Sequence, residues 1–222
     1  MTAQPISARN LLRETFAAIR DLYTPLLIIN SPSLIFGVLE IFNLGSASIG
    51  LTLINLYVVI PFLSGAMIFY ICRSFTENPV TVNEAFQQAN RKLLPILSSY
   101  ILSMLCILLG FILLIIPGFY VSFRLTFSLF AAVLDNSSAQ DSIKKSWELT
   151  KGRWWLVCRS TVLILSVFLV PLILIVLLLD LTGQSLASQI VSNILVFLIS
   201  PFITVYMVVL YQSLQQSAAT IE

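Results

Sequence analysis

The sequence predicts an all-α integral membrane protein, a bundle of about six transmembrane helices with amphipathic helices at the membrane surface. Of the 222 residues, 58% are hydrophobic and only 10% are charged, whereas soluble domains have about 25% charged residues. The apolar residues fall into runs close to or above the ~18 residues that cross a bilayer. Because these runs cover almost the whole chain, residues 1–222 are expected to form one membrane domain.

The expected elements follow from the positions of these runs. Residues 1–21 repeat apolar side chains at helical spacing, as at Leu12, Phe16 and Ile19, which predicts an amphipathic helix on the membrane surface. A kink or break is expected in the first span, which contains Pro25 and the cluster Asn30-Ser31-Pro32, because proline removes a backbone donor. The six spans are predicted near residues 22–42, 51–72, 93–116, 118–134, 156–179 and 190–211.

Two loops between the spans are predicted to form further amphipathic helices. Thr81 and Glu84 have the spacing of a capping box, which favours a helix start at this point. Ser138 and Asp141 begin a second helix in the same way, and Gly152 stands where a helix-terminating glycine belongs.

The second of these helices, residues 138–151, is expected to turn one face to the bundle. Spacings of three and four residues place Ser142, Ile143, Ser146, Trp147 and Thr150 on that face. The Trp147 ring should then be buried, and Lys144 and Lys145 exposed.

The basic residues indicate how the chain is oriented, because short loops rich in lysine and arginine stay in the cytoplasm. Eleven of the twelve precede the first span or follow the second and fourth spans. Both termini and both capped loops are therefore predicted to be cytoplasmic.

Arg124 is the one basic residue that this topology places within the membrane, toward the outer end of the fourth span. A charge at mid-depth costs ~2.5 kcal/mol or more, so a partner is expected for it. Glu40, near the outer end of the first span, is the candidate for an intramembrane pair of functional or structural role. Helix-end carbonyls, or extension of the side chain to the outer headgroups, are the alternatives.

Aromatic and basic residues that follow the fourth span predict an interfacial contact surface. Anchoring against anionic lipid would explain them, since a basic residue near the surface contributes about 1 kcal/mol. Specific recognition of a lipid headgroup or a partner protein is the alternative. The candidate contacts are Trp147, Lys151, Gly152, Arg153, Trp154 and Trp155.

Several small or polar residues lie inside the predicted spans and are interpreted as helix-packing positions. They would line a substrate path only if they converged on one cavity with Arg124. These residues are Asn30, Ser31, Asn55, Ser64, Gly65 and Ser103.

The sequence offers no catalytic or metal-binding pattern. It contains no histidine, which is the commonest general base and zinc ligand. The three cysteines are scattered without a CxxC spacing. We therefore expect no cofactor and no metal. The formal charge of +2 without a basic block argues against nucleic acid as a partner.

Residues 116–155 carry a family resemblance, in Ile116-Pro-Gly-Phe-Tyr and in the block from Ser146-Trp-Glu-Leu-Thr-Lys to Gly152. They resemble the membrane domain of some bacterial glycerophosphoryl diester phosphodiesterases, which also occurs alone in inner-membrane proteins. Residues 61–70, 80–94 and 201–211 are similar to that family as well. The resemblance implies a bacterial inner membrane. Because the chain ends eleven residues after the last predicted span, a stand-alone member without the catalytic domain is expected.

Three functions are compatible with these observations. The leading interpretation is a non-enzymatic scaffold, anchor or accessory subunit that binds membrane lipids, another membrane protein or a second copy of itself. The alternative is a small transporter or lipid-handling protein with a path near Arg124. An intramembrane enzyme is the third, and the lack of histidine argues against it.

Overall fold

The computed structural model describes residues 8–41, 46–76, 79–135 and 137–219 and contains no strand within them. The predicted all-α membrane fold is confirmed. Five helical segments are long and apolar enough to cross a membrane, or six if one bent pair counts as a span. The helices are α1 (Ala8–Asn30), α2 (Pro32–Ile41), α3 (Ser46–Ile54), a π-helix η1 (Asn55–Val59), α4 (Ile60–Ser74), α5 (Val82–Arg91), α6 (Leu93–Leu113), α7 (Ile115–Arg124), α8 (Ser128–Leu134), α9 (Ala139–Leu149), α10 (Trp154–Leu181) and α11 (Ser185–Ala219).

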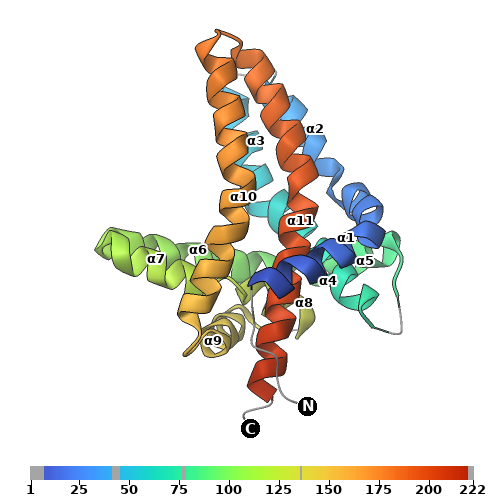
Figure 1. Ribbon diagram of the computed structural model, residues 1–222, viewed down its shortest axis with the longest axis vertical. Coiled ribbons are helices and arrows are strands. Elements are labelled where there is room, and N and C mark those ends of the chain that lie inside the picture. Colours follow the sequence, from blue (N-terminus) through green and yellow to red (C-terminus); the bar gives the residue numbers. More distant parts are fainter. Residues whose placement is uncertain (1–7, 42–45, 77–78, 136, 220–222) are drawn as a thin grey trace.

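Two helical hairpins give the molecule its shape. Helices α10 and α11 stand together along the long axis, while α6 and α7 form a hairpin that projects to one side near the base (Figure 1). The 28 residues of α10 extend ~42 Å at 1.5 Å per residue, more than the ~30 Å hydrocarbon core. In the most apolar stretch of α10 only 6% of the residues are buried, as expected of a helix that faces lipid.

Helix α11 is the centre of the packing and contacts α1, α2, α4, α9 and α10. Its second half contributes fully buried side chains to the core, including Tyr206 and Leu210. These pack with Leu26 and Ile29 of α1 and with Ile71 of α4 in one apolar cluster. The core therefore lies where α1 and α4 cross α11.

The first predicted span is broken where the sequence predicted a break. Helix α1 ends at Asn30, α2 begins at Pro32, and the two are bent by 50°. The boundary expected near residue 21 is absent, because α1 continues from the amphipathic N-terminal segment into the first half of the span.

The fourth predicted span is also broken, which the sequence did not indicate. Helix α7 ends at Arg124 and α8 begins at Ser128. The second span is unbroken from Ile49 to Ser74 but includes the π-helical turn η1.

The capping signals of the two loop helices are confirmed. Thr81 caps α5 in a complete capping box with Glu84, and hydrogen bonds from the Thr81 backbone and hydroxyl lower the pKa of the Glu84 carboxyl. The Ser138 hydroxyl accepts from the Asp141 N–H at the start of α9. Gly152 follows α9 with φ +73°, the left-handed conformation that favours glycine.

Candidate functional site

Arg124 is buried at the end of α7, with 4% of its surface exposed. Its Nη1 donates a hydrogen bond to Thr150 Oγ1 at 3.2 Å. The guanidinium carbon lies 4.3 Å from the centre of the Trp147 ring and 5.7 Å from that of Tyr120. Arg124 thus joins α7 to the end of α9 through the Thr150 hydroxyl and the Trp147 ring, while Tyr120 of its own helix adds a second aromatic face that attracts a cation.

The structure does not bring Arg124 and Glu40 together. Glu40 lies on α2 and accepts a hydrogen bond from Asn55 Nδ2 at 3.3 Å. Within the described residues the one ion pair joins Lys145 and Asp135 at 3.1 Å. The predicted pair is therefore wrong, because Arg124 contacts Thr150 and Trp147 while Glu40 bonds to Asn55 at a different place in the fold.

The end of α7 is held by hydroxyl groups of α9. Ser146 Oγ donates to the Arg124 carbonyl at 2.7 Å and accepts from the Phe127 N–H at 3.2 Å. The Thr150 hydroxyl lies 3.4 Å from the same carbonyl. Backbone groups freed by the break between α7 and α8 are thus satisfied by a buried helix face, as a break within an apolar environment requires.

The predicted bundle-facing side of α9 is only partly as expected. Ser142, Ser146 and Thr150 are buried, but the Trp147 ring is 38% exposed. The small hydroxyl residues fill the interface because α6 and α8 approach α9 closely. Trp147 instead covers the edge of that interface and packs on Tyr120, whose ring centre lies 5.9 Å away.

The remaining residues of the predicted contact surface divide into two groups. Lys151, Gly152 and Trp155 are exposed, Trp155 by 66%. Trp154 packs on Tyr120 at 5.5 Å between ring centres. Arg153 turns back to α11, where its two terminal nitrogens each donate to a main-chain carbonyl, of Leu214 and Ser217, at 2.9 Å.

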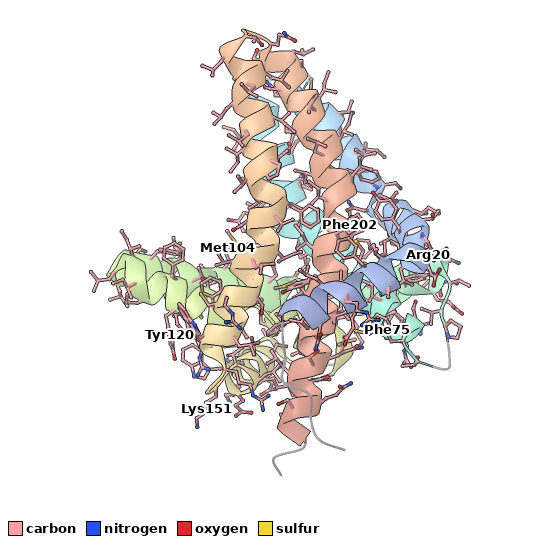
Figure 2. All side chains as sticks on the ribbon, in the orientation of Figure 1. Arg20, Phe75, Met104, Tyr120, Lys151 and Phe202 are labelled. Carbon is pink, nitrogen blue, oxygen red and sulfur yellow. The ribbon has the colours of Figure 1, made fainter. Side chains whose placement is uncertain are left out.

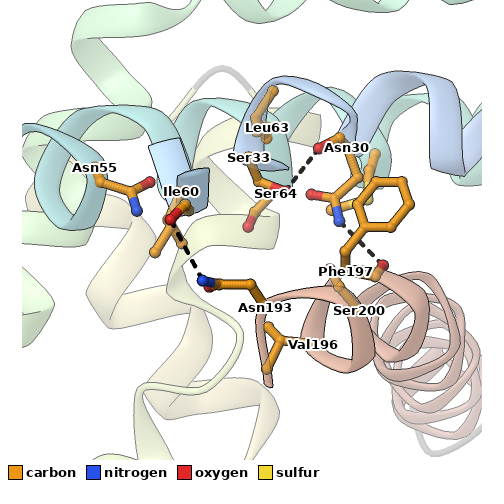
Figure 3. A pocket seen from close by; sticks show the side chains of 12 residues that line it. Asn30, Ser33, Asn55, Ile60, Leu63, Ser64, Asn193, Val196, Phe197 and Ser200 are labelled. Carbon is orange, nitrogen blue, oxygen red and sulfur yellow. Dashed lines mark hydrogen bonds between the residues drawn. The ribbon is translucent and has the colours of Figure 1, made fainter. Parts of the chain in front are cut away.

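A polar cavity of about 200 Å³ lies between α1, α2, α4 and α11 (Figure 3). Among the described residues, its polar side chains are three asparagines and three serines, and none of the lining residues is charged. The lining residues are Asn30, Ser33, Gly37, Asn55, Ile60, Leu63, Ser64, Met67, Asn193, Val196, Phe197 and Ser200.

Three irregularities in the helices meet at this cavity. They are the break after Asn30, the π-helical turn that begins at Asn55, and Pro201 within α11. Pro201 leaves the Phe197 carbonyl, four residues earlier, without its helical donor. Asn30 Nδ2 lies 3.3 Å from that carbonyl and donates to it. The residue at the break between α1 and α2 thus supplies the hydrogen bond that Pro201 removes from α11.

The amide nitrogens of all three asparagines donate hydrogen bonds to protein atoms. Besides the bond from Asn30, Asn193 Nδ2 donates to the Gly37 carbonyl at 3.4 Å and Asn55 Nδ2 to Glu40. Asn55 Oδ1 is buried and has no hydrogen-bond partner. Each of these nitrogens donates one bond to the protein and has a second N–H, so the asparagines retain donors as well as acceptors.

Only half of the polar span residues singled out in the sequence reach this cavity. Asn30, Asn55 and Ser64 line it. Ser103 and Gly65 have packing roles, as predicted: Ser103 bonds to Ser128 across α6 and α8, and a Cβ at Gly65 would lie 2.8 Å from Ile96. Ser31 does not, because it is exposed and its hydroxyl bonds to the Ile28 carbonyl three residues earlier.

Arg124 does not line the cavity, so the convergence required for a path near Arg124 is not found. Sequence reasoning missed Ser33, Asn193 and Ser200. Asn193 is the most polar residue within the sixth span, and Ser200 directly precedes a proline. These two features of the sequence could have indicated that Asn193 and Ser200 line a cavity.

No metal centre is indicated, since the described residues contain no group of three or more Cys, Asp or Glu side chains that could hold an ion. The fold and the cavity define a multi-pass helical membrane protein with an uncharged polar cavity between its helices.

The chain belongs to the family of the membrane domain of glycerophosphoryl diester phosphodiesterase, whose family model matches residues 95–222, more than half of the sequence. No curated protein and no solved structure matches the chain. The match covers α6 to α11, including Arg124 and the α11 side of the cavity, and does not reach α1 to α4.

Proposed function

We propose that this chain is a non-enzymatic membrane protein that binds the headgroup of a membrane lipid in the cavity between α1, α2, α4 and α11. The observation that carries the proposal is a polar cavity with an apolar mouth. Ile60 of α4 and Val196 of α11 both line the cavity, yet they are 41% and 53% exposed. The cavity therefore opens on the flank of the molecule between these helices.

The surface around this mouth suits hydrocarbon. Val58, Ile194 and Leu198 are exposed apolar residues of the same helical segments. A ligand that enters from such a flank needs an apolar portion that remains outside and a polar portion that reaches the asparagines. A membrane lipid has both parts.

The lining residues also argue for binding without catalysis. Hydrolysis of a headgroup would need a general acid or base beside the scissile bond, and the lining offers amides and hydroxyls only. The sequence has no histidine. For this reason the phosphodiesterase activity named in the family description is not assigned to the chain.

The proposed setting is a bacterial inner membrane, with the α9 end of the molecule in the cytoplasm. The basic residues support this orientation, because Arg124, Lys145 and Arg153 all contact segments at the α9 end. Arg124, which was the exception to the charge distribution in the sequence, hydrogen-bonds to the residue that precedes Lys151.

The test is native mass spectrometry of the protein purified in a mild detergent. The wild-type protein should retain lipid, and Ser64→Leu should lose it because the longer side chain occupies the cavity. Ser166→Leu, on the exposed side of α10, is the matched control and should retain lipid. Equal retention by the two variants, or a wild-type protein without lipid, would contradict the proposal.

Catalysis is tested separately. The purified protein should leave glycerophosphodiesters intact with and without added divalent metal ions. Hydrolysis that co-purifies with the protein through repeated chromatography would show that it is an enzyme.

A scaffold that binds a partner protein is the second candidate, favoured by the exposed Trp155 beside the exposed Lys151. Exposed tryptophan is enriched in protein interfaces as well as at membrane surfaces. Cross-linking from a photoreactive residue at position 155 in native membranes distinguishes the two. Adducts with one protein support the scaffold, and adducts with lipid alone oppose it.

A further inference from the structure

We infer that the headgroup received by this cavity is uncharged and rich in hydroxyl groups, as in a glycosyl diacylglycerol, an inference that rests on the proposed function. It concerns the class of lipid that the lining selects. The argument comes from the hydrogen-bonding state of the lining atoms and from the absence of charge among them.

The asparagine amides give the lining both donors and acceptors, because the protein uses only one of the two N–H bonds of each amide. The Nδ2 atoms of Asn30, Asn55 and Asn193 donate to the Phe197 carbonyl, the Glu40 carboxylate and the Gly37 carbonyl. The carboxylate of Glu40 can only accept, so Nδ2 and not Oδ1 of Asn55 faces it. Oδ1 of Asn55 has no hydrogen-bond partner but is fully buried, so a ligand hydroxyl reaches it only if the Asn55 side chain moves toward the cavity.

An unpaired buried acceptor is costly, by about 1–3 kcal/mol, and a ligand hydroxyl would relieve that cost. Ser64 and Ser200 add hydroxyls that can donate as well as accept. A headgroup with several hydroxyls can donate to the amide oxygen and exchange hydrogen bonds with both serines.

A phosphate headgroup does not fit this lining. No lysine or arginine lines the cavity, and the carboxylate of Glu40 is one hydrogen bond away through Asn55. Burial of an anion without a cation is strongly unfavourable. The cavity should therefore exclude phosphatidyl lipids even when their outer headgroup carries hydroxyls.

The size and mouth of the cavity agree with a lipid rather than a soluble polyol. About 200 Å³ is room for one small polar group and not for acyl chains. The exposed Ile60 and Val196 place hydrocarbon at the opening, where the acyl chains would remain.

The experiment is a competition measured by native mass spectrometry on the full chain in detergent. A monohexosyl diacylglycerol, a phosphatidylglycerol and a diacylglycerol with the same acyl chains are added in equal amounts, and free hexose is added in a parallel sample. The hexosyl lipid should be retained at least roughly tenfold over phosphatidylglycerol, a difference of about 1.4 kcal/mol.

The variants locate the binding. Asn55→Leu and the milder Ser64→Ala should each lower hexosyl-lipid retention roughly threefold to tenfold, the value of one hydrogen bond between uncharged groups. Ser166→Ala on α10 is the matched control and should change nothing. If Asn55→Leu fails to fold, Ser64→Ala and Ser200→Ala still test the site.

The outcomes are distinguishable. Equal retention of the three lipids would overturn the headgroup class and leave lipid binding standing. Retention of no lipid by the wild-type protein would overturn the proposed function itself. Free hexose that binds as tightly as the hexosyl lipid would identify a soluble polyol as the ligand and overturn the lipid assignment.

Discussion

The guanidinium of Arg124 lies next to the rings of Trp147 and Tyr120, at the point where the C-terminal ends of α7 and α9 meet. Each helix end carries about half a negative charge from its unsatisfied carbonyls. Aromatic faces add about 2 kcal/mol when the cation is desolvated. Together these groups stabilise a buried cation that has no carboxylate among its described contacts.

The first prediction concerns this cluster. Arg124→Gln and Trp147→Ala should each lower the free energy of unfolding, and together they should cost about 0.5–2 kcal/mol less than the sum. The cost of Trp147→Ala alone should stay below the ~3–5 kcal/mol of a fully buried ring, because Trp147 is 38% exposed.

The measurement is reversible unfolding in mixed micelles, arranged as a double-mutant cycle. Glu40→Gln serves as the control partner and should be additive with Arg124→Gln within about 0.5 kcal/mol. Additivity of the Arg124 and Trp147 substitutions would mean that the ring contributes nothing to holding the charge.

The second prediction compares two serines on the same face of α9. Ser146→Ala should lower the free energy of unfolding by about 1–3 kcal/mol, because it leaves the Phe127 N–H and the Arg124 carbonyl without Ser146. Ser142 lies one turn earlier and is buried, but its hydroxyl has no partner. Ser142→Ala should therefore be neutral or stabilising. A similar cost for both substitutions would show that burial and not hydrogen bonding decides the effect.

At the scale of elements, the helices are interrupted where another helix supplies the missing hydrogen bonds. The gap between α7 and α8 is met by α9, and the carbonyl freed by Pro201 of α11 is met by Asn30 at the end of α1. In each case the interruption and its compensation come from different helices. The irregular segments are thereby fixed in one arrangement.

The third prediction tests this compensation between α1 and α11. Asn30→Ala should destabilise the wild-type protein by roughly 1 kcal/mol or more, since it leaves the Phe197 carbonyl unpaired. In the Pro201→Ala background the same substitution should cost less, because the N–H of residue 201 can then reach that carbonyl. Thermal unfolding of the four variants measures the coupling. An equal cost of Asn30→Ala in both backgrounds would contradict it.

At the scale of the whole molecule, the basic residues differ between the two ends of the long axis. Lys145 and Arg153 bind groups near α9 and at the end of α11, while the turn between α10 and α11 has no basic residue. In the view of Figure 2, Lys151 lies near the base, opposite the far end of the α10–α11 hairpin. This distribution is the basis of the proposed orientation.

The fourth prediction concerns that orientation. In a variant without the three native cysteines, a cysteine at Gln184 should react with an impermeant maleimide in intact cells, and one at Gln140 should react only after permeabilisation. Both positions are exposed, so the side of the membrane on which each residue lies decides whether the maleimide reaches it. The opposite labelling pattern would invert the proposed topology.

Much of the architecture was readable from local sequence. The apolar runs predicted the membrane-crossing helices, and Thr81, Ser138 and Gly152 marked helix ends correctly. The break after Asn30 was also foreseen. These features depend on residues within a few positions of one another, so the order of residues is sufficient to predict them.

The partners of the buried polar groups were not readable in this way. The pairing of Arg124 with Glu40 was inferred from matching depths along straight spans, and it is wrong because Arg124 meets Thr150 and Trp147 while Glu40 bonds to Asn55. The cavity likewise combines Asn30, Asn55 and Asn193 from three distant segments. Nothing in the local pattern of any one segment specifies the other two.

The sequence by itself determined that the chain is a helical membrane protein, which regions form its long apolar helices, and which loops carry capped amphipathic helices. Hydrophobic runs, caps and prolines act locally, and a bilayer requires the backbone to satisfy its hydrogen bonds within helices. Only the tertiary structure decided how Arg124 is held and that an uncharged polar cavity exists beside α11. Those features depend on where a helix breaks and on which distant side chain meets the freed group, and helix packing sets both.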